Sequence, residues 1–247
     1  LACRRPLVVL IDRASASASE IVAGLLQDSG RAVVVGDTQS HGKGTVQTVL
    51  PIGDDKYGSM KITTARFYRI NGSSTQVRGV GSDIVIPSVL DELDIGEDKL
   101  PNALPWSRIE PAPYALAWNM PDYVVPLRAG SAERLAVNPR YTRHVRAVHA
   151  MRAASRRVSV PLARAVRLAL MRQERALRDL EDVDDADDGL SATLPAPSAS
   201  AAVKASDDGD VVLAESFNIL ADLVRKTGGA EVPSASDESS KRGWMRF

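Results

Sequence analysis

Two apolar runs near the start of the chain predict a strand, a helix and a second strand. Residues 6–11 (PLVVLI) form a short continuous apolar run rich in β-branched residues, which is typical of a strand buried on both faces. Apolar residues then recur at helical spacing over residues 21–26, followed by Gly30 as a helix-ending glycine. Residues 31–36 repeat the strand pattern. This order predicts a βαβ unit with parallel strands and a right-handed crossover.

The pattern beyond this unit indicates strands or hairpins and then an arm. Residues 45–50 and 59–70 are β-rich, and an Asn-Gly turn at 71–72 precedes a further strand predicted at 75–80. Residues 88–126 are interrupted by Pro and Asp. This punctuation favours an ordered connecting arm without regular structure.

The second half of the chain has helical composition and low-complexity segments. Helices are expected at 131–155 and 161–182 from their Ala, Arg and Leu content, and an amphipathic helix is expected at 211–226. Residues 183–210 consist largely of Asp, Ala, Ser and Pro, which indicates a linker or disordered loop. The Ser-rich tail at 229–247 is predicted to be disordered.

The charges balance overall but are separated along the chain. There are 31 basic and 31 acidic residues, yet twelve arginines fall between Arg134 and Arg178, and an acidic run follows at 181–188. Such helices could bind nucleic acid or an anionic membrane surface. No known reader motif accompanies them, so solvated helix faces are the favoured interpretation and no nucleic acid is expected.

Cysteine and histidine usage gives no sign of a metal site. Cys3 is the single cysteine, so neither an intrachain disulfide nor a Cys-rich metal site is available. His144 and His149 are five residues apart, which differs from the four-residue spacing of a helical metal pair. No apolar stretch approaches the ~20 residues of a spanning helix. The start at Leu1 suggests a soluble fragment or processed piece.

Ser17 is a candidate nucleophile. It lies at the turn between the first strand and the first helix, where unpaired backbone N–H groups attract anions, and the N–H of Ala18 is placed to stabilise an oxyanion. The alternative is structural, because Ser17 and Glu20 also fit a capping box. On this motif alone, the helix cap is favoured.

Lys43 is a candidate base, flanked by Gly42 and Gly44. A lysine acts as a general base only in its neutral form, which burial or nearby positive charge favours. Taken alone, Lys43 would be interpreted as a surface residue. His41 is the rival base, since Ser-His pairing is the commoner solution.

A phosphate-binding loop is a weaker alternative for this segment. Residues 36–45 place five residues rather than four between the glycines, and Gly44 stands where Ser or Thr would bind magnesium. Residues 46–51 also have the pattern of a strand where that motif requires a helix.

Together these segments resemble the C-terminal processing peptidase family, and within it the tail-specific proteases of bacteria. Residues 6–27 (PLVVLIDRASASASEIVAGLLQ) are similar to the family's nucleophile segment. DSGRAVVVGD and HGKGTVQ are similar to its base segment. The similarity continues through KITTARFYRINGSSTQVRGVGSDIVIPS, LPNALPW and NPRY, and weakly to AESFNILADLV.

The resemblance implies a Ser-Lys site without metal or organic cofactor. Ser17 aligns with the nucleophile, Lys43 with the general base and Gln47 with the residue that orients the lysine. If residues 43–47 form a strand, its two-residue period puts these two side chains on the same side. Asp28 matches a supporting acidic residue, with a structural cap as the equal alternative.

Two departures from the family pattern concern the base. The loop before Lys43 is one residue longer than usual, and His41 replaces what is commonly an aromatic residue. The loop could absorb this change or misplace the lysine. A displacement of about 1 Å can cost roughly a hundredfold in rate, so the path of this loop determines whether Lys43 can act as the base.

The resemblance further implies a periplasmic serine endopeptidase that recognises the C-termini of protein substrates, either unfolded or apolar at that end. Its fold would be α/β, with part of a crotonase-like catalytic core followed by a mainly helical C-terminal domain. An upstream PDZ-like domain and a glycine-containing oxyanion segment are not among these residues. Peripheral membrane association stays open, and the alternative is a non-catalytic or truncated interaction protein with arginine-rich helices.

The domain organisation expected on this basis has five parts. They are part of the catalytic core at 1–116, a connecting arm and helical domain at 117–182, a low-complexity linker at 183–210, a terminal helix at 211–228 and a disordered tail at 229–247.

Overall fold

The computed structural model describes residues 5–53, 56–159, 161–172 and 210–229. Almost all of the predicted linker and tail therefore lies outside the described residues, as do the last ten residues of the helix predicted at 161–182. No helix in the described ranges is long and apolar enough to cross a membrane.

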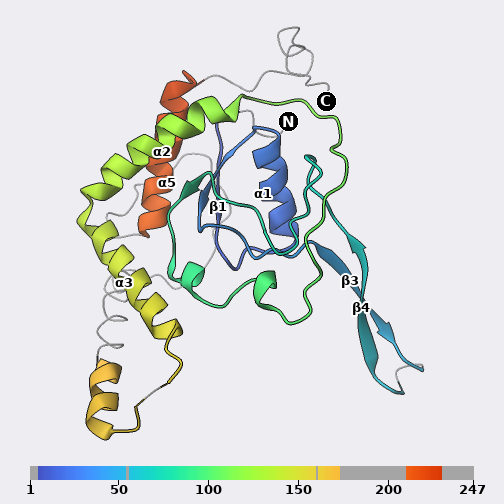
Figure 1. Cartoon of the computed structure of the whole chain (residues 1–247). Coiled ribbons are helices and arrows are strands. Elements are labelled where there is room, and N and C mark those ends of the chain that lie inside the picture. The colour runs from blue at the N-terminus through green and yellow to red at the C-terminus, as the bar shows by residue number, and fades with distance from the viewer. Residues whose placement is uncertain (1–4, 54–55, 160, 173–209, 230–247) are drawn as a thin grey trace, which may run out of the picture.

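A parallel sheet lies at the centre of the molecule (Figure 1). Its strands β1 (Val8–Ile11), β2 (Val33–Gly36) and β5 (Ile84–Val85) occur in the order β1-β2-β5. The first and last residues of β1 pair with the first and last of β2, and β5 pairs with the last two residues of β2. Helix α1 (Ala18–Asp28) connects β1 to β2. The predicted parallel βαβ unit is confirmed.

Helices cover both faces of this sheet (Figure 1). The middle valine of β2 packs with Ala23 of α1, while the valines on either side of it pack with helices α2 (Met120–Ala136) and α5 (Val211–Lys226). All three valines are fully buried, as expected for a strand between two helical layers. In β1, Leu10 is 44% exposed, so the burial on both faces predicted for residues 6–11 is not complete there, whereas β2 is buried throughout.

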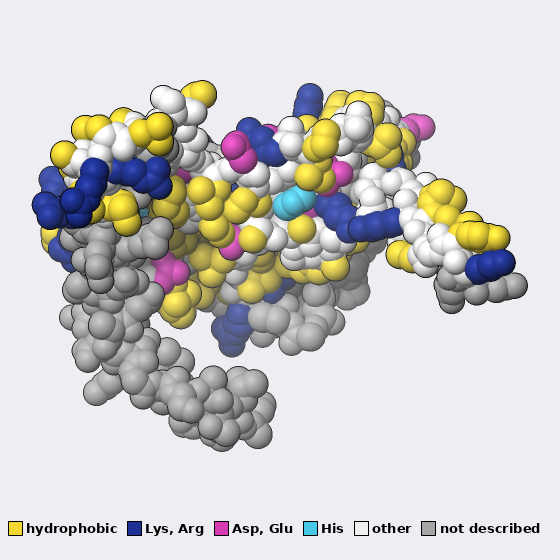
Figure 2. Space-filling model, turned by 90° about the horizontal axis from the view of Figure 1, so that it is seen from below, with side chains coloured by type: hydrophobic (Ala, Val, Ile, Leu, Met, Phe, Trp, Pro, Cys, Tyr) yellow, Lys and Arg dark blue, Asp and Glu magenta, His cyan; other side chains and the backbone are white. Residues whose placement is uncertain are grey.

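An antiparallel hairpin projects from this body. It consists of β3 (Thr45–Pro51) and β4 (Ser59–Arg66), as the β-rich pattern predicts. A bulge interrupts the pairing between Val46 and Gln47. Figure 2 shows the hairpin at the right with hydrophobic side chains near its tip, and Lys and Arg side chains gathered on the opposite side of the molecule.

The strand predicted at 75–80 is wrong, because this segment forms a loop. Val77 and Gly79 have φ angles of 69° and 60°, which no extended strand contains. The β-branched residues in this segment favour a strand locally, but the segment instead forms turns that contact other parts of the chain, such as Gly42.

The arm predicted at 88–126 contains more regular structure than expected. It includes two short 3₁₀ helices, η1 (Val89–Glu92) and η2 (Glu97–Lys99), and it ends where α2 begins at Met120. Two prolines explain the difference from the prediction. Pro121 lies in the first turn of α2, where its missing N–H has no partner to lose, and Pro126 lies inside the helix, where proline is normally unfavourable.

The single helix predicted at 131–155 is divided in two. Helix α2 ends at Ala136, and α3 (Pro139–Ser155) begins after Asn138, whose side chain accepts the N–H of Arg140 at 2.9 Å. Residues 164–172 are helical, in agreement with that part of the helix predicted at 161–182, and almost all of their side chains are exposed. Helix α5 has the predicted bounds.

Candidate active site

The β1–α1 turn (residues 12–17) carries the candidate nucleophile. The Asp12 carboxylate accepts hydrogen bonds from the N–H of Ala14 at 3.1 Å and the N–H of Ser15 at 2.7 Å, which folds the turn back on itself. Ser17 follows with a φ of 59°, a left-handed conformation that is uncommon outside glycine. Such backbone strain concentrates at functional sites, where surrounding contacts maintain it.

The capping box predicted from Ser17 and Glu20 is present at the start of α1. Glu20 Oε2 accepts the Ser17 N–H at 2.8 Å. A helix cap by itself requires no contact beyond the helix. The further contacts of Glu20 therefore distinguish this site from an ordinary cap.

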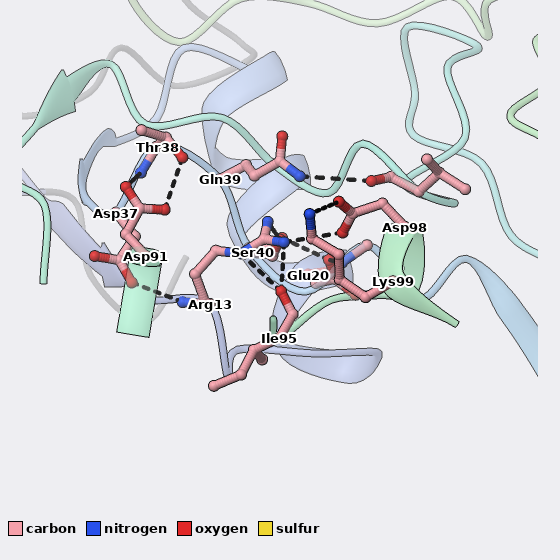
Figure 3. Close-up of polar contacts among 12 residues, drawn as sticks. Arg13, Glu20, Asp37, Thr38, Gln39, Ser40, Asp91, Ile95, Asp98 and Lys99 are labelled. Carbon is pink, nitrogen blue, oxygen red and sulfur yellow. Dashed lines mark hydrogen bonds and ion pairs between the residues drawn. The ribbon is translucent and has the colours of Figure 1, made fainter. Parts of the chain in front are cut away.

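The Glu20 carboxylate joins the two segments that carry the candidate dyad. Figure 3 shows Glu20 beside Ser40, at the start of the segment that carries Lys43. Glu20 Oε2 also accepts the Lys43 N–H at 2.9 Å, while Oε1 accepts the Gly42 N–H at 2.6 Å and the Ser40 hydroxyl at 2.5 Å. Glu20 is fully buried. Because one oxygen receives the backbone N–H groups of both Ser17 and Lys43, these residues lie side by side.

The lysine loop (residues 40–44) is fixed by other backbone contacts as well. The His41 N–H donates to the Ser15 carbonyl at 2.9 Å, and the Gly42 carbonyl accepts the Val77 N–H at 2.7 Å. Gly42 has a φ of 95°, which favours glycine at this position. The lengthened loop is thus held directly against the β1–α1 turn.

The backbones of the two candidate dyad residues are close in the fold, because their N–H groups share Glu20 Oε2. Among the described residues, no hydrogen bond joins the Ser17 hydroxyl to the Lys43 amine. Both residues are partly buried. The ring Nδ1 of His41, the rival base, is buried and has no hydrogen-bond partner in the described ranges. The roles of Ser17, Lys43 and His41 stay predictions.

The other candidate residues lie at the edges of this arrangement. Ala18 is the first residue of α1, where a backbone N–H has no acceptor within the helix. Gln47 lies in β3 beyond the bulge, whereas Lys43 precedes that strand. The two-residue period therefore does not relate Lys43 to Gln47, and the orienting role of Gln47 stays a prediction.

Asp28 ties the end of α1 to the segment after β4. It accepts two hydrogen bonds from the Arg69 guanidinium, at 2.8 and 2.6 Å, and one from Asn71 at 2.9 Å. The helix cap is Ser29, so the capping role considered for Asp28 is not what the structure contains. Its contacts are compatible with the supporting role, which stays a prediction.

Buried charged groups surround the site. Arg13 donates its backbone N–H to Asp37 Oδ2 at 2.9 Å, and Ser88 donates its N–H to Asp37 Oδ1 at 2.6 Å. Burial raises the pKa of Asp37 above its ordinary value, against the opposing effect of these hydrogen bonds. The sequence predicted Glu20 only as a helix cap and predicted no role for Arg13, whose side-chain partners lie up to 85 residues away.

The phosphate-loop alternative finds no support in the geometry of this segment. Strand β3 begins at Thr45, directly after the glycine that follows Lys43. A phosphate-binding loop instead leads into a helix, whose N-terminus faces the phosphate.

Comparisons with known proteins assign the chain to a family. The model of "Peptidase family S41" matches residues 1–86, and that of the "C-terminal domain of tail specific protease" matches residues 90–225. The tail-specific protease of Haemophilus influenzae is 42% identical over 120 residues, which cover 46% of this chain and 17% of that protein. The carboxy-terminal-processing protease of Bartonella bacilliformis is 50% identical over 94 residues, which cover 38% of this chain and 21% of that protein.

A solved structure of a photosystem II D1 C-terminal processing protease is 41% identical, with a TM-score of 0.30 over 33% of this chain and 20% of that chain. The chain spans about a fifth of the length of the curated relatives it matches. Since the tail-specific C-terminal domain matches more than half of it, next to the S41 peptidase match, the chain belongs to the tail-specific protease family.

Proposed function

We propose that this chain carries the catalytic centre of a serine endopeptidase that selects protein substrates by their C-termini. Ser17 is the nucleophile and Lys43 the general base. Gln47 orients the lysine, the Ala18 N–H stabilises the oxyanion, and Asp28 supports the site. No metal or organic cofactor is needed for this chemistry.

One observation carries the proposal. Glu20 Oε2 accepts the backbone N–H of Ser17 at 2.8 Å and that of Lys43 at 2.9 Å, so a single buried atom links the two predicted catalytic segments. A surface lysine and an unrelated helix cap would have no reason to share a buried carboxylate. This link supports a common function for the two residues.

The reaction proceeds by acyl transfer. The Ser17 hydroxyl oxygen attacks the scissile carbonyl carbon while its proton passes to the neutral Lys43 amine. The lysine returns that proton to the leaving nitrogen as the C–N bond breaks, which leaves an acyl-enzyme. Water then hydrolyses the ester and restores the Ser17 hydroxyl. The Ala18 N–H stabilises the negative oxygen in both halves.

The substrates proposed here are unfolded proteins or proteins with apolar C-termini. The names of the relatives, which include carboxy-terminal-processing and tail-specific proteases, support selection at that end of the substrate. We also propose a crotonase-like catalytic core, a PDZ-like domain upstream of these residues, and a periplasmic location. The helical region from residue 117 onward forms the scaffold around that core.

The test is cleavage of an unfolded substrate by the full-length protein. Ser17→Ala and Lys43→Ala should each lower kcat by at least about 1,000-fold, since each removes a group that bonds or transfers a proton in the reaction. Ser19→Ala and Lys61→Ala, at exposed positions, are the matched controls and should retain activity. Cleavage retained by a folded Ser17→Ala or Lys43→Ala variant would contradict the dyad.

Substrate selection is tested with two unfolded substrates that differ only in their last three residues. The substrate with three apolar C-terminal residues should be cleaved with a higher kcat/KM than the substrate that ends in three aspartates. Equal values for the two substrates would contradict recognition of the C-terminus.

A further inference from the structure

A loop far along the chain reaches the β1–α1 turn. This 95–98 loop includes the first two residues of the short helix η2. Its Ile95 carbonyl accepts hydrogen bonds from Arg13 Nε at 3.1 Å and Nη2 at 2.5 Å, and Asp98 Oδ1 accepts one from Nη2 at 2.9 Å (Figure 3). The same guanidinium donates through Nη1 to the Ser40 carbonyl at 3.0 Å. Arg13 is buried, and it therefore fixes the 95–98 loop against the β1–α1 turn and the lysine loop together.

The 95–98 loop also reaches the lysine loop through a fully buried glutamine. Gln76 Oε1 accepts the Gly44 N–H at 2.9 Å, and Gln76 Nε2 donates to Glu97 Oε1 at 2.9 Å. The Glu97 N–H in turn donates to the His41 carbonyl at 2.9 Å. Gln76 and Glu97 thus hold the residues on both sides of Gly42 and Lys43.

The segment that presents Gln76 has little freedom to adjust. Val77 has a φ of 69°, an outlying conformation for a β-branched residue, and its N–H donates to the Gly42 carbonyl at 2.7 Å. A Cβ atom added to Gly44 would lie only 2.6 Å from the backbone nitrogen of Gln76 and 2.8 Å from Ser74 Oγ. The lysine loop is therefore closely packed against this segment.

We propose that Gln76 and Glu97 are positioning residues for Lys43, so that the 95–98 loop is part of the catalytic apparatus. This inference rests on the proposed function. Glu97 lies within the residues matched by the tail-specific C-terminal domain, whereas Ser17, Lys43 and Gln76 lie within the S41 match. The C-terminal segment thereby controls the alignment of the base, and a displacement of about 1 Å is enough to cost roughly a hundredfold in rate.

Exchanging the Gln76 amide and the Glu97 carboxylate, singly and together, tests the hydrogen bond between them in the full-length protein. Gln76→Glu places two carboxylates against each other and should lower kcat by about 100-fold with KM unchanged. Glu97→Gln keeps an acceptor for the Gln76 amide and should retain kcat within about threefold. The double exchange should restore kcat, because the amide introduced at position 97 can donate to the carboxylate introduced at position 76.

A matched control and a milder variant complete the test. Gln27→Glu also brings a carboxylate beside an acid, since Gln27 Nε2 donates to Asp83 at 2.9 Å, and it should leave kcat unchanged. Glu97→Ala, at a partly exposed position, should lower kcat about tenfold where Glu97→Gln does not. This difference tests the inference even if Gln76→Glu fails to fold.

Two results would overturn the inference, and each is distinct from failure of the proposed function. One is a folded Gln76→Glu enzyme with the parent kcat. The other is a loss of kcat that the double exchange does not reverse. Loss of cleavage in Ser17→Ala, measured in the same assay, shows that the proposed function holds in either case. Retained cleavage in Ser17→Ala contradicts the proposed function, whatever the exchange shows.

Discussion

The candidate active site and the helical layer, formed by α2 and α5, are stabilised by different interactions. Where α2 and α5 pack on the sheet the core is mainly apolar, with Leu127, Ile219 and Leu223 fully buried. Around the β1–α1 turn and the lysine loop, the fully buried side chains include Glu20 and Gln76, and both bond backbone N–H groups. The stability of the helical layer therefore depends mainly on buried apolar area, and that of the candidate site on a few buried hydrogen-bond acceptors.

This difference determines how each region should respond to substitution. Apolar packing is spread over many side chains, so removing one leaves the remainder in place at the cost of a cavity. A buried carboxylate that serves four donors has no substitute, and its loss leaves those donors without partners. Substitutions in the helical layer should therefore change stability alone, while those at the site should change both stability and turnover.

Glu20→Ala should have the largest effect. It leaves the N–H groups of Ser17, Gly42 and Lys43 and the Ser40 hydroxyl without their acceptor, so we expect a loss of roughly 3–5 kcal/mol in the free energy of unfolding. If the proposed dyad is correct, kcat should fall at least about 100-fold, because the segments of Ser17 and Lys43 lose the carboxylate that both contact. Urea unfolding and substrate cleavage measure these two quantities.

The control for Glu20→Ala is Glu133→Ala, at an exposed position of α2. It should leave both quantities unchanged. A Glu20→Ala protein with the parent kcat would show that the buried carboxylate does not align the proposed dyad. The two regions would then differ only in how substitutions change the free energy of unfolding.

Leu223→Ala should separate stability from turnover. Leu223 is fully buried in the core between α5 and the sheet, so its truncation should cost about 2–5 kcal/mol in unfolding free energy. The kcat of the folded protein should stay within about twofold, because no bond to the site is removed. Val224→Ala, one residue along and 39% exposed, is the control and should cost under about 1 kcal/mol. A large fall in kcat for folded Leu223→Ala would break the contrast.

The elements that the sequence predicts well are those with local signals. Apolar β-branched runs on either side of a segment with helical spacing predicted the parallel βαβ unit. Helical spacing that ends before a pair of glycines predicted α5. The loop at 75–80 was missed because its turns serve contacts with distant residues, such as the bond from Val77 to Gly42. Local propensity cannot represent a conformation that is maintained by tertiary contacts.

The candidate site also combines local signals with contacts between distant residues. Local motifs made Ser17 and Lys43 candidates, and the resemblance to the family gave them their roles, which stay predictions. Glu20 was predicted only as a capping residue three positions from Ser17. Its bonds to the lysine loop span 20 to 23 residues, and those of Gln76 to Gly44 span 32. Nothing in the residue pattern specifies which buried acceptor meets which loop.

Arg134→Met tests whether the helical layer also contains an important polar contact. The Arg134 guanidinium donates to Glu215 at 2.6 and 3.0 Å and to Asp222 at 2.7 Å, and Glu215 is 4% exposed. Hydrogen bonding with Glu215 raises the pKa of Arg134. Since Arg134 is itself partly exposed, we expect a loss of about 1–2 kcal/mol in unfolding free energy, with kcat unchanged.

The controls for Arg134→Met use the same helices. Arg225→Met removes an exposed partner of Asp222 and should cost at most about 0.5 kcal/mol. Arg134→Met combined with Glu215→Met should recover part of the loss, because no buried charge is then left unpaired. If the double variant is no more stable than Arg134→Met alone, the unpaired carboxylate is not the cause of the loss.

Glu92→Gln should have the smallest effect, at the contact between η1 and α3. Two hydrogen bonds from the Arg152 guanidinium, one of them at 2.6 Å from Nε, hold the pKa of Glu92 below its ordinary value of 4.5. A carboxylate with a lowered folded pKa contributes stability above its unfolded pKa, and that contribution is lost as the pH falls through the folded value. The substitution should therefore lower Tm slightly at pH 7.

The pH dependence distinguishes this ion pair from the buried acids beside the sheet. The difference in Tm between the parent and Glu92→Gln should shrink as the pH falls below 4.5, since the parent then loses its carboxylate as well. Burial raises the pKa of Asp37 and Asp83, so ionisation of these groups costs stability as the pH rises above 3.8. Thermal unfolding between pH 3 and 7 measures both trends. A Tm difference that stays constant over this range would show that Glu92 stabilises the junction through packing and not through its charge.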